Sequence, residues 1–421
     1  MEDSMPHAYR ILFLMAETGA GHRSAAEAIR SAIHLLTATP GQHGELDADD
    51  AVAQAHMSCA YHTENIDAFA ACGRFPLRKI GRLYGWSIRY TPRLYGALFH
   101  LTNHRRSFAL LERALYRLLR RGLAQLLRQT RPDMIVCVHP LLSHAALRAL
   151  DEAGLRIPFL TVMTDPVTPH RSWVAPAADH CIVPTDMARD FCQQHGMPDD
   201  NIAVLGMPID LKFSRPCASK ALLRKQLGLH PTMPVVLVMG GGEGAGKLVQ
   251  RVRALWRAAL PVQLVIVTGR NERLRRRLEQ MARELPVPLQ QRQHILGFAQ
   301  NMHELMQAAD LIVTKAGPGT ISEAMACRLP IVLSGCIPGQ EEGNVRYVCD
   351  EGIGVLAETE EELVAILQEC FQRDAVMLEQ MRANMSRLQK PFAALAIAEF
   401  ILRASSPHYS QVASRERVVV A

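Results

Sequence analysis

The stretch Ile11-Leu-Phe-Leu-Met15, followed by Glu17-Thr-Gly-Ala-Gly-His-Arg23 and then by Ser24-Ala-Ala-Glu-Ala-Ile-Arg-Ser-Ala-Ile-His-Leu-Leu36, decides the fold. Its first part is a continuous apolar run of strand length, its second is a glycine turn, and its third has helical apolar spacing. Ser24 with Glu27 three residues later reads as a capping box, so we expect the helix to begin at Ser24. A strand, a glycine turn and a helix in this order open a doubly wound α/β domain.

The same unit occurs again in the second half of the chain, where the apolar run 234–239 leads into the glycine-rich loop 240–246. Further apolar strand candidates lie at residues 134–138, 159–163, 181–183, 264–267, 294–296, 311–313 and 331–333. Strands that are apolar on both faces predict a parallel sheet covered by helices. We therefore expect an α/β protein with two Rossmann-like doubly wound domains, over residues 1–208 and 209–390. A C-terminal helix and flexible tail would occupy residues 391–421, with the helix free to pack back on the first domain.

The composition bounds the class of protein. The chain has 421 residues, is 48% hydrophobic and carries a net charge of +6, which excludes a disordered or collagen-like chain. No apolar run approaches the ~20 residues needed to span a bilayer. The start of the chain is acidic and polar, unlike a secretory signal. Ten cysteines without a CxxC pair indicate reduced thiols rather than disulfides or a zinc site.

The basic residues are concentrated between Arg74 and Arg131. This segment holds thirteen arginines and Lys79 against the single acid Glu112, so its net charge is +13 and the rest of the chain is acidic. Such an asymmetry predicts an anionic partner: nucleic acid, a membrane surface or an acidic substrate. The first part of the segment interleaves aromatic and basic side chains, among them Tyr84, Trp86, Arg89 and Arg93. That texture suits single-stranded nucleic acid or a membrane interface, whereas the Leu/Arg spacing from Leu110 onward indicates an amphipathic helix on the sheet.

Glycine loops that enter helices point to phosphate binding, because they free backbone N–H groups at a positive helix end. Residues 241–247 match GxxxxGK, but Leu248 stands where a P-loop needs a magnesium-binding hydroxyl, so a nucleotide hydrolase is excluded. That backbone can still cradle a diphosphate. The loop Lys315-Ala-Gly-Pro-Gly-Thr320 is another such turn. Glu323 behind it either accepts from ribose hydroxyls or only complements the helix dipole.

Polar residues after other strands complete the candidate site. Gln340, Glu341 and Asn344 suit a polyhydroxyl ligand such as a sugar, since loops beyond the carboxyl ends of strands bind ligands in α/β domains. His22 lies next to a helix start, which favours the neutral imidazole that a general base requires. His139 and Asp165 follow strands of the same domain, so we expect them at the same edge as His22.

Together these blocks resemble the monogalactosyldiacylglycerol synthases, lipid glycosyltransferases related to the bacterial enzyme that makes lipid II. The resemblance covers roughly residues 9–390. It rests on ETGAGHRSAAEAIR, RPDMIVCVHPL, TVMTDPVTPHRSWVAP, LGMPI, VLVMGGGEGAG, VTGRN, GFAQNM, ADLIVTKAGPGTISEA and IPGQEEGNV, in this order. It implies a GT-B fold, in which two Rossmann-like domains face each other across a cleft. It also implies a UDP-hexose donor, a diacylglycerol acceptor, inversion at the sugar C1, and neither a catalytic metal nor a cofactor.

The resemblance also implies residue roles. His22 would be the catalytic base, with Asp165 close by as the second catalytic residue. The donor would be held by Gly242, Glu243, Gly297, Phe298, Gly317, Gly319, Thr320, Glu323, Gln340, Glu341 and Asn344. The acceptor and the membrane would be contacted by Gly21, His139, Trp173, Tyr84, Trp86, Arg89 and Arg93.

We therefore expect a peripheral enzyme on the cytoplasmic side of a membrane, bound to anionic lipids and not to nucleic acid. It would move galactose from UDP-galactose to the 3-hydroxyl of 1,2-diacylglycerol. One alternative keeps the chemistry with UDP-glucose as donor, possibly in processive transfer. Another is a non-catalytic protein that binds a sugar nucleotide or nucleic acid. No residue identified above decides between galactose and glucose, which differ only at C4.

Overall fold

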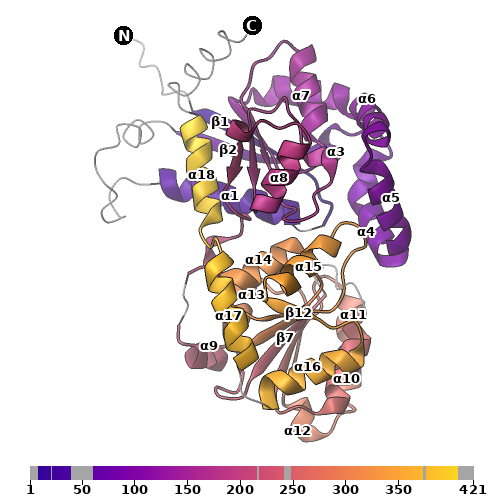
Figure 1. Cartoon of the computed structure of the whole chain (residues 1–421), viewed down its shortest axis with the longest axis vertical. Helices are drawn as coiled ribbons and strands as arrows, with labels where there is room; N and C mark the ends of the chain where they lie inside the picture. Colours follow the sequence, from indigo (N-terminus) through magenta and orange to yellow (C-terminus); the bar gives the residue numbers. More distant parts are fainter. Residues whose placement is uncertain are drawn as a thin grey trace. The chain divides into compact units, whose positions relative to one another are not determined.

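The computed structural model describes residues 8–19, 21–38, 60–215, 218–240, 248–372 and 376–405. The chain forms two compact units. The first contains the chain up to Leu83, His100–Leu211 and the C-terminal stretch from Phe392, and the second contains Tyr84–Phe99 and Lys212–Pro391. Each unit has one six-stranded sheet in which every pairing is parallel, covered by helices (Figure 1). The expected α/β architecture with two Rossmann-like units, the GT-B type, is confirmed.

The first sheet has the strand order β2-β1-β3-β4-β5-β6. Its strands are β1 (Tyr9–Met15), β2 (Tyr61–Asp67), β3 (Met134–Cys137), β4 (Phe159–Val162), β5 (His180–Val183) and β6 (Ile202–Val204). The helices of this half of the chain are α1 (Gly21–Thr37), α3 (Ala68–Cys72), α4 (Ile80–Tyr90), α5 (Pro92–Thr102), α6 (Arg105–Thr130), α7 (Ser143–Glu152) and α8 (Asp186–Gln194). Most of α4 and α5 belongs to the second unit, because that unit includes Tyr84–Phe99.

The second sheet has the order β12-β11-β10-β7-β8-β9. Its strands are β7 (Val235–Met239), β8 (Gln263–Val267), β9 (Gln293–Leu296), β10 (Leu311–Thr314), β11 (Ile331–Leu333) and β12 (Gly354–Leu356). The helices are α9 (Lys220–Gln226), α10 (Leu248–Ala258), α11 (Glu272–Ala282), α12 (Val287–Gln290), α13 (Met302–Ala308), α14 (Pro318–Ala326), α15 (Glu342–Asp350), α16 (Glu360–Gln372) and α17 (Val376–Leu388). The last helix among the described residues is α18 (Ala393–Ala404).

Helices cover both faces of the first sheet. On one face α6 buries Leu115, Leu119 and Leu123 in the same cluster as Phe159 of β4, which confirms the expected amphipathic helix. On the other face α18 packs against α1 in one apolar cluster, so α18 belongs to the core of the first unit. Each fully buried leucine or isoleucine contributes about 1.5–3 kcal/mol relative to an exposed one. Among the described residues, no helix combines the length and apolar composition needed to cross a bilayer.

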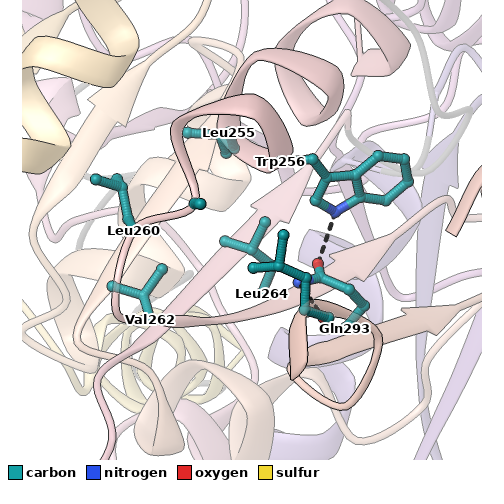
Figure 2. Close-up of a pocket in the computed structure, with 8 residues that line it drawn as sticks. Leu255, Trp256, Leu260, Val262, Leu264 and Gln293 are labelled. Carbon is teal, nitrogen blue, oxygen red and sulfur yellow. Dashed lines mark hydrogen bonds between the residues drawn. The ribbon is translucent and has the colours of Figure 1, made fainter. Parts of the chain in front are cut away.

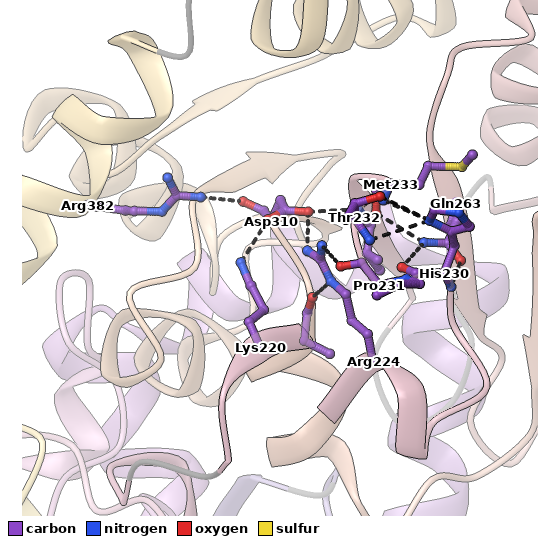
Figure 3. Close-up of polar contacts among 11 residues, drawn as sticks. Lys220, Arg224, His230, Pro231, Thr232, Met233, Gln263, Asp310 and Arg382 are labelled. Carbon is purple, nitrogen blue, oxygen red and sulfur yellow. Dashed lines mark hydrogen bonds and ion pairs between the residues drawn. The ribbon is translucent and has the colours of Figure 1, made fainter. Parts of the chain in front are cut away.

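Asp310, just before β10, ties two helices to the second sheet (Figure 3). Its carboxylate accepts from Lys220 Nζ at 2.7 Å and from Arg224 Nη2 at 2.6 Å, both on α9. The same carboxylate accepts from the backbone N–H that opens β7, and the Asp310 carbonyl accepts from Arg382 of α17. This network fixes the amino-terminal edge of the sheet.

Two sequence expectations differ from the structure. The strands β2, β6 and β12 were not expected from the sequence; two of them are short and β2 is mostly polar, and all three lie at sheet edges. The expected start of the first helix at Ser24 is wrong, because α1 begins at Gly21. Gly19 has φ +86°, which lets the loop turn three residues earlier than the capping box suggested. His22 therefore lies in the first turn of the helix rather than in a loop.

Candidate active site

In the first unit, the carboxyl ends of β1, β3 and β4 surround the first turn of α1. His22 is almost fully buried there. Its Nδ1 lies 3.2 Å from the hydroxyl of Thr164, which follows β4. The ring also has a hydrogen bond to the Val138 carbonyl, which follows β3. Gly21 opens the helix, and a Cβ there would meet no atom within 4 Å, so open space borders His22.

The environment of His22 keeps its imidazole neutral. Burial lowers the pKa from 6.5 to about 4, partly offset by the hydrogen bond to the Val138 carbonyl. A neutral imidazole near pH 7 is the form that can accept a proton from a substrate hydroxyl. This geometry agrees with the role predicted for His22, which remains a prediction.

His139 lies directly against His22, with ring centroids 4.6 Å apart. Its Nδ1 accepts from the Leu141 backbone N–H at 3.2 Å, so the ring proton sits on Nε2, which donates to Thr18 Oγ1 at 2.9 Å. Burial, and then repulsion from His22, lower the His139 pKa well below its usual value. His139 is therefore a fixed neutral donor that holds the loop in front of α1.

Asp165 and Trp173 form a buried pair beside this cluster. The Trp173 indole N–H donates to Asp165 Oδ2 at 2.7 Å, and its ring lies 5.9 Å from that of His22. Trp173 is 0% exposed. The structure puts the indole inside the first unit, as a partner of Asp165, and its predicted place on the acceptor side stays a prediction.

The aromatic segment predicted to meet the membrane forms α4 and α5. Trp86 is exposed on α4, with its ring 5.9 Å from that of the exposed Tyr90. Arg93 is exposed at the start of α5, and the side chain of Arg89 lies outside the described part of the structure. Tyr84 is half-buried, and its hydroxyl donates a hydrogen bond to Gln340 in the loop after β11. Of the predicted membrane residues on these helices, Trp86 and Arg93 are exposed, whereas Tyr84 is half-buried against Gln340.

In the second unit, the loop after β10 leads into α14. Gly317 caps this helix and Pro318 occupies its first turn, a position where the missing N–H of proline costs nothing. The first-turn N–H groups of Gly319 and Thr320 face out of the helix end. A Cβ at Gly319 would meet no atom within 4 Å. Such an end can receive a diphosphate, and Glu323 lies in the same helix.

The loop after β11 is fastened to the loop after β10. Glu341 is buried; its Oε1 forms an ion pair with Lys315 and its Oε2 accepts from the Ile337 N–H at 2.8 Å. Asn344 donates from Nδ2 to the Ala316 carbonyl at 2.9 Å. Both side chains thus hold the two loops together. Lys315 is a site residue that sequence reasoning did not single out, although its cationic place at the start of the glycine loop was a usable signal.

Gly297 and Phe298 follow β9 at the same carboxyl edge of the second sheet. The Phe298 ring is exposed, and the Arg270 guanidinium lies 5.3 Å from its centroid. Gly297 lies next to the Arg275 side chain. Gly242 and Glu243, the remaining predicted donor residues, fall outside the described residues.

A shallow apolar pocket lies at the opposite edge of the same sheet (Figure 2). It is lined by Leu260, Val262 and Leu264 around the start of β8, and by Trp256, whose indole donates to Gln293 Oε1 at 2.7 Å. Ligands of parallel sheets bind beyond the carboxyl ends of strands. This pocket at the amino ends therefore does not belong to the candidate donor site.

Asp67 was missed from the sequence because β2 was not expected. Its Oδ2 accepts from the Glu17 N–H at 3.2 Å, and its Oδ1 caps α3 by accepting from the Phe69 and Ala70 N–H groups. Arg23 forms an ion pair with Glu17. These contacts, with the bond from His139 to Thr18, hold the loop that precedes His22.

Comparison with known proteins finds matches in both halves of the chain. Residues 22–209 match the family model of monogalactosyldiacylglycerol (MGDG) synthase, and residues 235–399 match the C-terminal domain of glycosyltransferase family 28. Monogalactosyldiacylglycerol synthase 1 of Arabidopsis thaliana is 34% identical over 92% of this chain and 69% of its own length. Probable monogalactosyldiacylglycerol synthase 2 of Oryza sativa subsp. japonica is 35% identical over 94% of this chain and 80% of its own length.

Solved structures agree with the fold. The UDP-GlcNAc 2-epimerase from Neisseria meningitidis has a TM-score of 0.58 at 13% identity, over 94% of this chain and 100% of that one. MurG of Acinetobacter baumannii has a TM-score of 0.54 at 14% identity, over 93% of this chain and 99% of that one. The expected resemblance is confirmed by the sequence relatives, which extend across both units. The chain belongs to the monogalactosyldiacylglycerol synthase family of glycosyltransferases.

Proposed function

We propose that this protein transfers galactose from UDP-galactose to the 3-hydroxyl of 1,2-diacylglycerol, with inversion at the sugar C1. The observation that carries the proposal is the identity of about one third to monogalactosyldiacylglycerol synthases over more than nine tenths of the chain. The chemistry of the two half-sites fits this reaction. The first unit offers a neutral imidazole, and the second offers helix N–H groups for a diphosphate.

In the proposed reaction, His22 removes the proton from the acceptor hydroxyl as the oxygen attacks C1. Its low pKa makes it a weak base, so the proton moves as the new C–O bond forms and the hydroxyl becomes acidic. The adjacent Thr164 hydroxyl and Val138 carbonyl orient the ring. His139 holds the neighbouring loop and does not itself take the proton.

The leaving UDP carries the developing negative charge. In the proposal, the first-turn N–H groups of α14 at Gly319 and Thr320 stabilise that charge, and Lys315 adds a cation. The proposal includes no catalytic metal, as the family resemblance implies, and Leu248 in place of a P-loop's magnesium-binding hydroxyl agrees with this. Activity retained in excess EDTA supports this part, and activity restored only by a divalent cation overturns it.

The reaction is tested by supplying diacylglycerol with either UDP-galactose or UDP-glucose and identifying the lipid product by mass spectrometry. We expect a hexosyl-diacylglycerol with UDP-galactose, and a β-anomeric proton coupling in its NMR spectrum. Faster product formation with UDP-glucose overturns the choice of donor. Products with several hexoses overturn single transfer, and no product with either donor overturns the glycosyltransferase reaction.

We also propose that α4 and α5 dock on an anionic lipid surface, which makes the protein peripheral on the cytoplasmic side. Trp86, Tyr90, Leu94 and Leu98 are large apolar side chains exposed on these two helices, and Arg93 lies among them. Aromatic and aliphatic groups beside arginine suit the headgroup region of an anionic bilayer. The high density of arginine along residues 74–131 adds long-range attraction.

Sedimentation with vesicles that contain or lack phosphatidylglycerol tests this docking. The wild type should bind the anionic vesicles, and added salt should weaken binding because it screens the arginines. Trp86→Ala with Leu94→Ala should reduce binding, whereas Leu222→Ala, an exposed leucine on α9, should not. Equal binding by both variants, or preference for single-stranded nucleic acid, contradicts the proposal.

A further inference from the structure

The side-chain amide of Gln340 is held by two tyrosines from a distant part of the sequence. The Tyr84 hydroxyl donates to Gln340 Oε1 at 3.3 Å, and the Tyr95 hydroxyl donates to the same oxygen at 2.9 Å. The two phenol rings form an edge-to-face pair, with centroids 5.6 Å apart and an interplanar angle of 78°. All three residues belong to the second unit. Two donors thus converge on one amide oxygen.

The backbone of α5 also packs closely on the Gln340 loop. A Cβ at Gly96 would lie 2.8 Å from Pro338 Cβ, so only glycine fits at this point of the helix. Gly339 has φ +79°, and a Cβ there would lie 3.0 Å from the Phe99 ring. Glycines on both sides of the contact allow α5 and the loop to approach each other. The close packing of α5 on this loop therefore brings the two tyrosine hydroxyls within hydrogen-bond distance of Gln340.

The chemistry of an amide makes this arrangement directional. The carbonyl oxygen accepts and the NH₂ group donates. Two phenol protons occupy both lone pairs of Oε1, so the amide cannot turn over without losing both hydrogen bonds. No hydrogen bond among the described residues uses Gln340 Nε2. Among the described residues, the NH₂ group therefore keeps its donor capacity.

We propose that Tyr84 and Tyr95 are positioning residues that fix the Gln340 amide so that its Nε2–H donates to a hydroxyl of the donor hexose. This inference rests on the proposed function, in which Gln340 contacts the hexose of a UDP-sugar. It assigns a role in donor recognition to residues of α4 and α5, separate from the exposed face of these helices. It also separates recognition of the sugar from recognition of UDP.

The test is calorimetric titration of the full-length protein with UDP and with UDP-galactose. Tyr84→Phe, Tyr95→Phe and the double variant remove only the hydroxyls. Because one neutral hydrogen bond is worth about a factor of 2 to 10 in affinity, we expect the double variant to bind UDP-galactose about 5- to 10-fold more weakly. The affinity for UDP should stay within about twofold, since UDP lacks the hexose. A general loss of folding would weaken both ligands equally.

Tyr347→Phe is the matched control. Tyr347 is a partly buried tyrosine in α15, the helix that follows the same loop, and burial next to Glu351 raises the pKa of its hydroxyl. It makes the same chemical change without touching Gln340. We expect this variant to bind both ligands like the wild type.

The decisive step combines the tyrosine changes with Gln340→Ala. If the tyrosines act through Gln340, the double tyrosine change should cause no further loss of UDP-galactose affinity once Gln340 is alanine. A further loss in that background, unchanged UDP-galactose affinity in the double tyrosine variant, or equal losses for UDP each overturn the inference. Product formation by the wild type tests the proposed function separately, so the two ideas fail by different results.

Discussion

The Nε2–H of His139 donates to the hydroxyl of Thr18, which holds the glycine loop immediately before His22. The opposite nitrogen of His139 accepts from the Leu141 N–H, so the tautomer is fixed by the backbone. The His139 ring also lies between His22 and Phe69, at centroid distances of 4.6 and 5.4 Å. One buried, neutral histidine therefore contacts both His22 and the loop that precedes it.

Replacing Thr18 should disturb this arrangement. Thr18→Val keeps the shape but leaves the buried Nε2–H of His139 without its acceptor, which costs about 1–3 kcal/mol. We expect urea unfolding to show this loss, together with a fall in kcat. Thr37→Val, which removes a hydroxyl bonded within the last turn of α1, should cost less than about 1 kcal/mol and leave kcat unchanged. Equal effects of the two variants would contradict the role of the Thr18 bond.

Removing the base should slow the reaction without weakening nucleotide binding. A general base contributes about 10²- to 10⁴-fold to the rate, so His22→Ala should lower kcat by that factor. The affinity for UDP should stay within about twofold, because the proposed UDP site lies in the second unit and His22 lies in the first. His34→Ala, at the far end of the same helix, is the control. Near-normal turnover in His22→Ala would remove His22 from the mechanism.

Acid should destabilise the protein through its buried histidines. Burial lowers the pKa of His22 and of His170 from 6.5 to about 4, and it lowers that of His139 further. The unfolded chain takes up these protons near pH 6.5 while the folded chain does not. Stability is therefore complete above pH 6.5 and falls as the pH drops from 6.5 towards 4.

The linkage predicts the size of this effect. Between pH 7.5 and pH 5, each histidine whose folded-state pKa is about 4 should lower the free energy of unfolding by about 2 kcal/mol. Urea unfolding at pH 7.5 and pH 5 measures this loss. The free energy of unfolding differs between pH 7.5 and pH 5, and His170→Asn should make this difference about 2 kcal/mol smaller. A variant with the wild-type difference would show that His170 does not titrate on unfolding.

The Asp310 network (Figure 3) predicts a large difference between two similar substitutions. Arg224 has a side chain that is 7% exposed, so Asp310→Asn leaves a buried cation without its counter-charge and should cost about 3–5 kcal/mol. Asp199→Asn removes the partner of Arg189 in an exposed pair, so its urea midpoint should stay close to that of the wild type. Urea unfolding compares the two directly, and similar midpoints would contradict the structural role of Asp310.

Much of the fold could be predicted from the sequence, because central parallel strands are apolar on both faces. Strands such as β3 and β7 stand out for this reason. β2 did not, since the polar sequence Tyr61–Asp67 lies at a sheet edge. Because β2 was not expected, Asp67 at its end was also missed; this residue joins the Glu17 loop to α3. Edge strands have one neighbour only, so their sequence is less constrained by burial.

The site residues that directly follow a strand could be predicted from the sequence. His22, His139 and Asp165 all follow strands of one sheet, and the structure brings them to the same edge. Contacts between distant segments were not predictable, because spacing carries no signal for them. The hydrogen bonds from Tyr84 and Tyr95 to Gln340 and the ion pair from Lys315 to Glu341 are of this kind. Burial of Trp173 was missed because its exposure depends on tertiary packing.

Because Tyr84–Phe99 belongs to the second unit, the division of the chain into units affects how chimeras between relatives should be joined. The polypeptide passes from one unit to the other four times, after Leu83, Phe99, Leu211 and Pro391. A chimera joined at a single crossover near Leu211 would combine the α5 of one parent with the Pro338 loop of the other. A chimera should therefore take on the donor preference of one parent only when it receives both Tyr84–Phe99 and the C-terminal half from that parent.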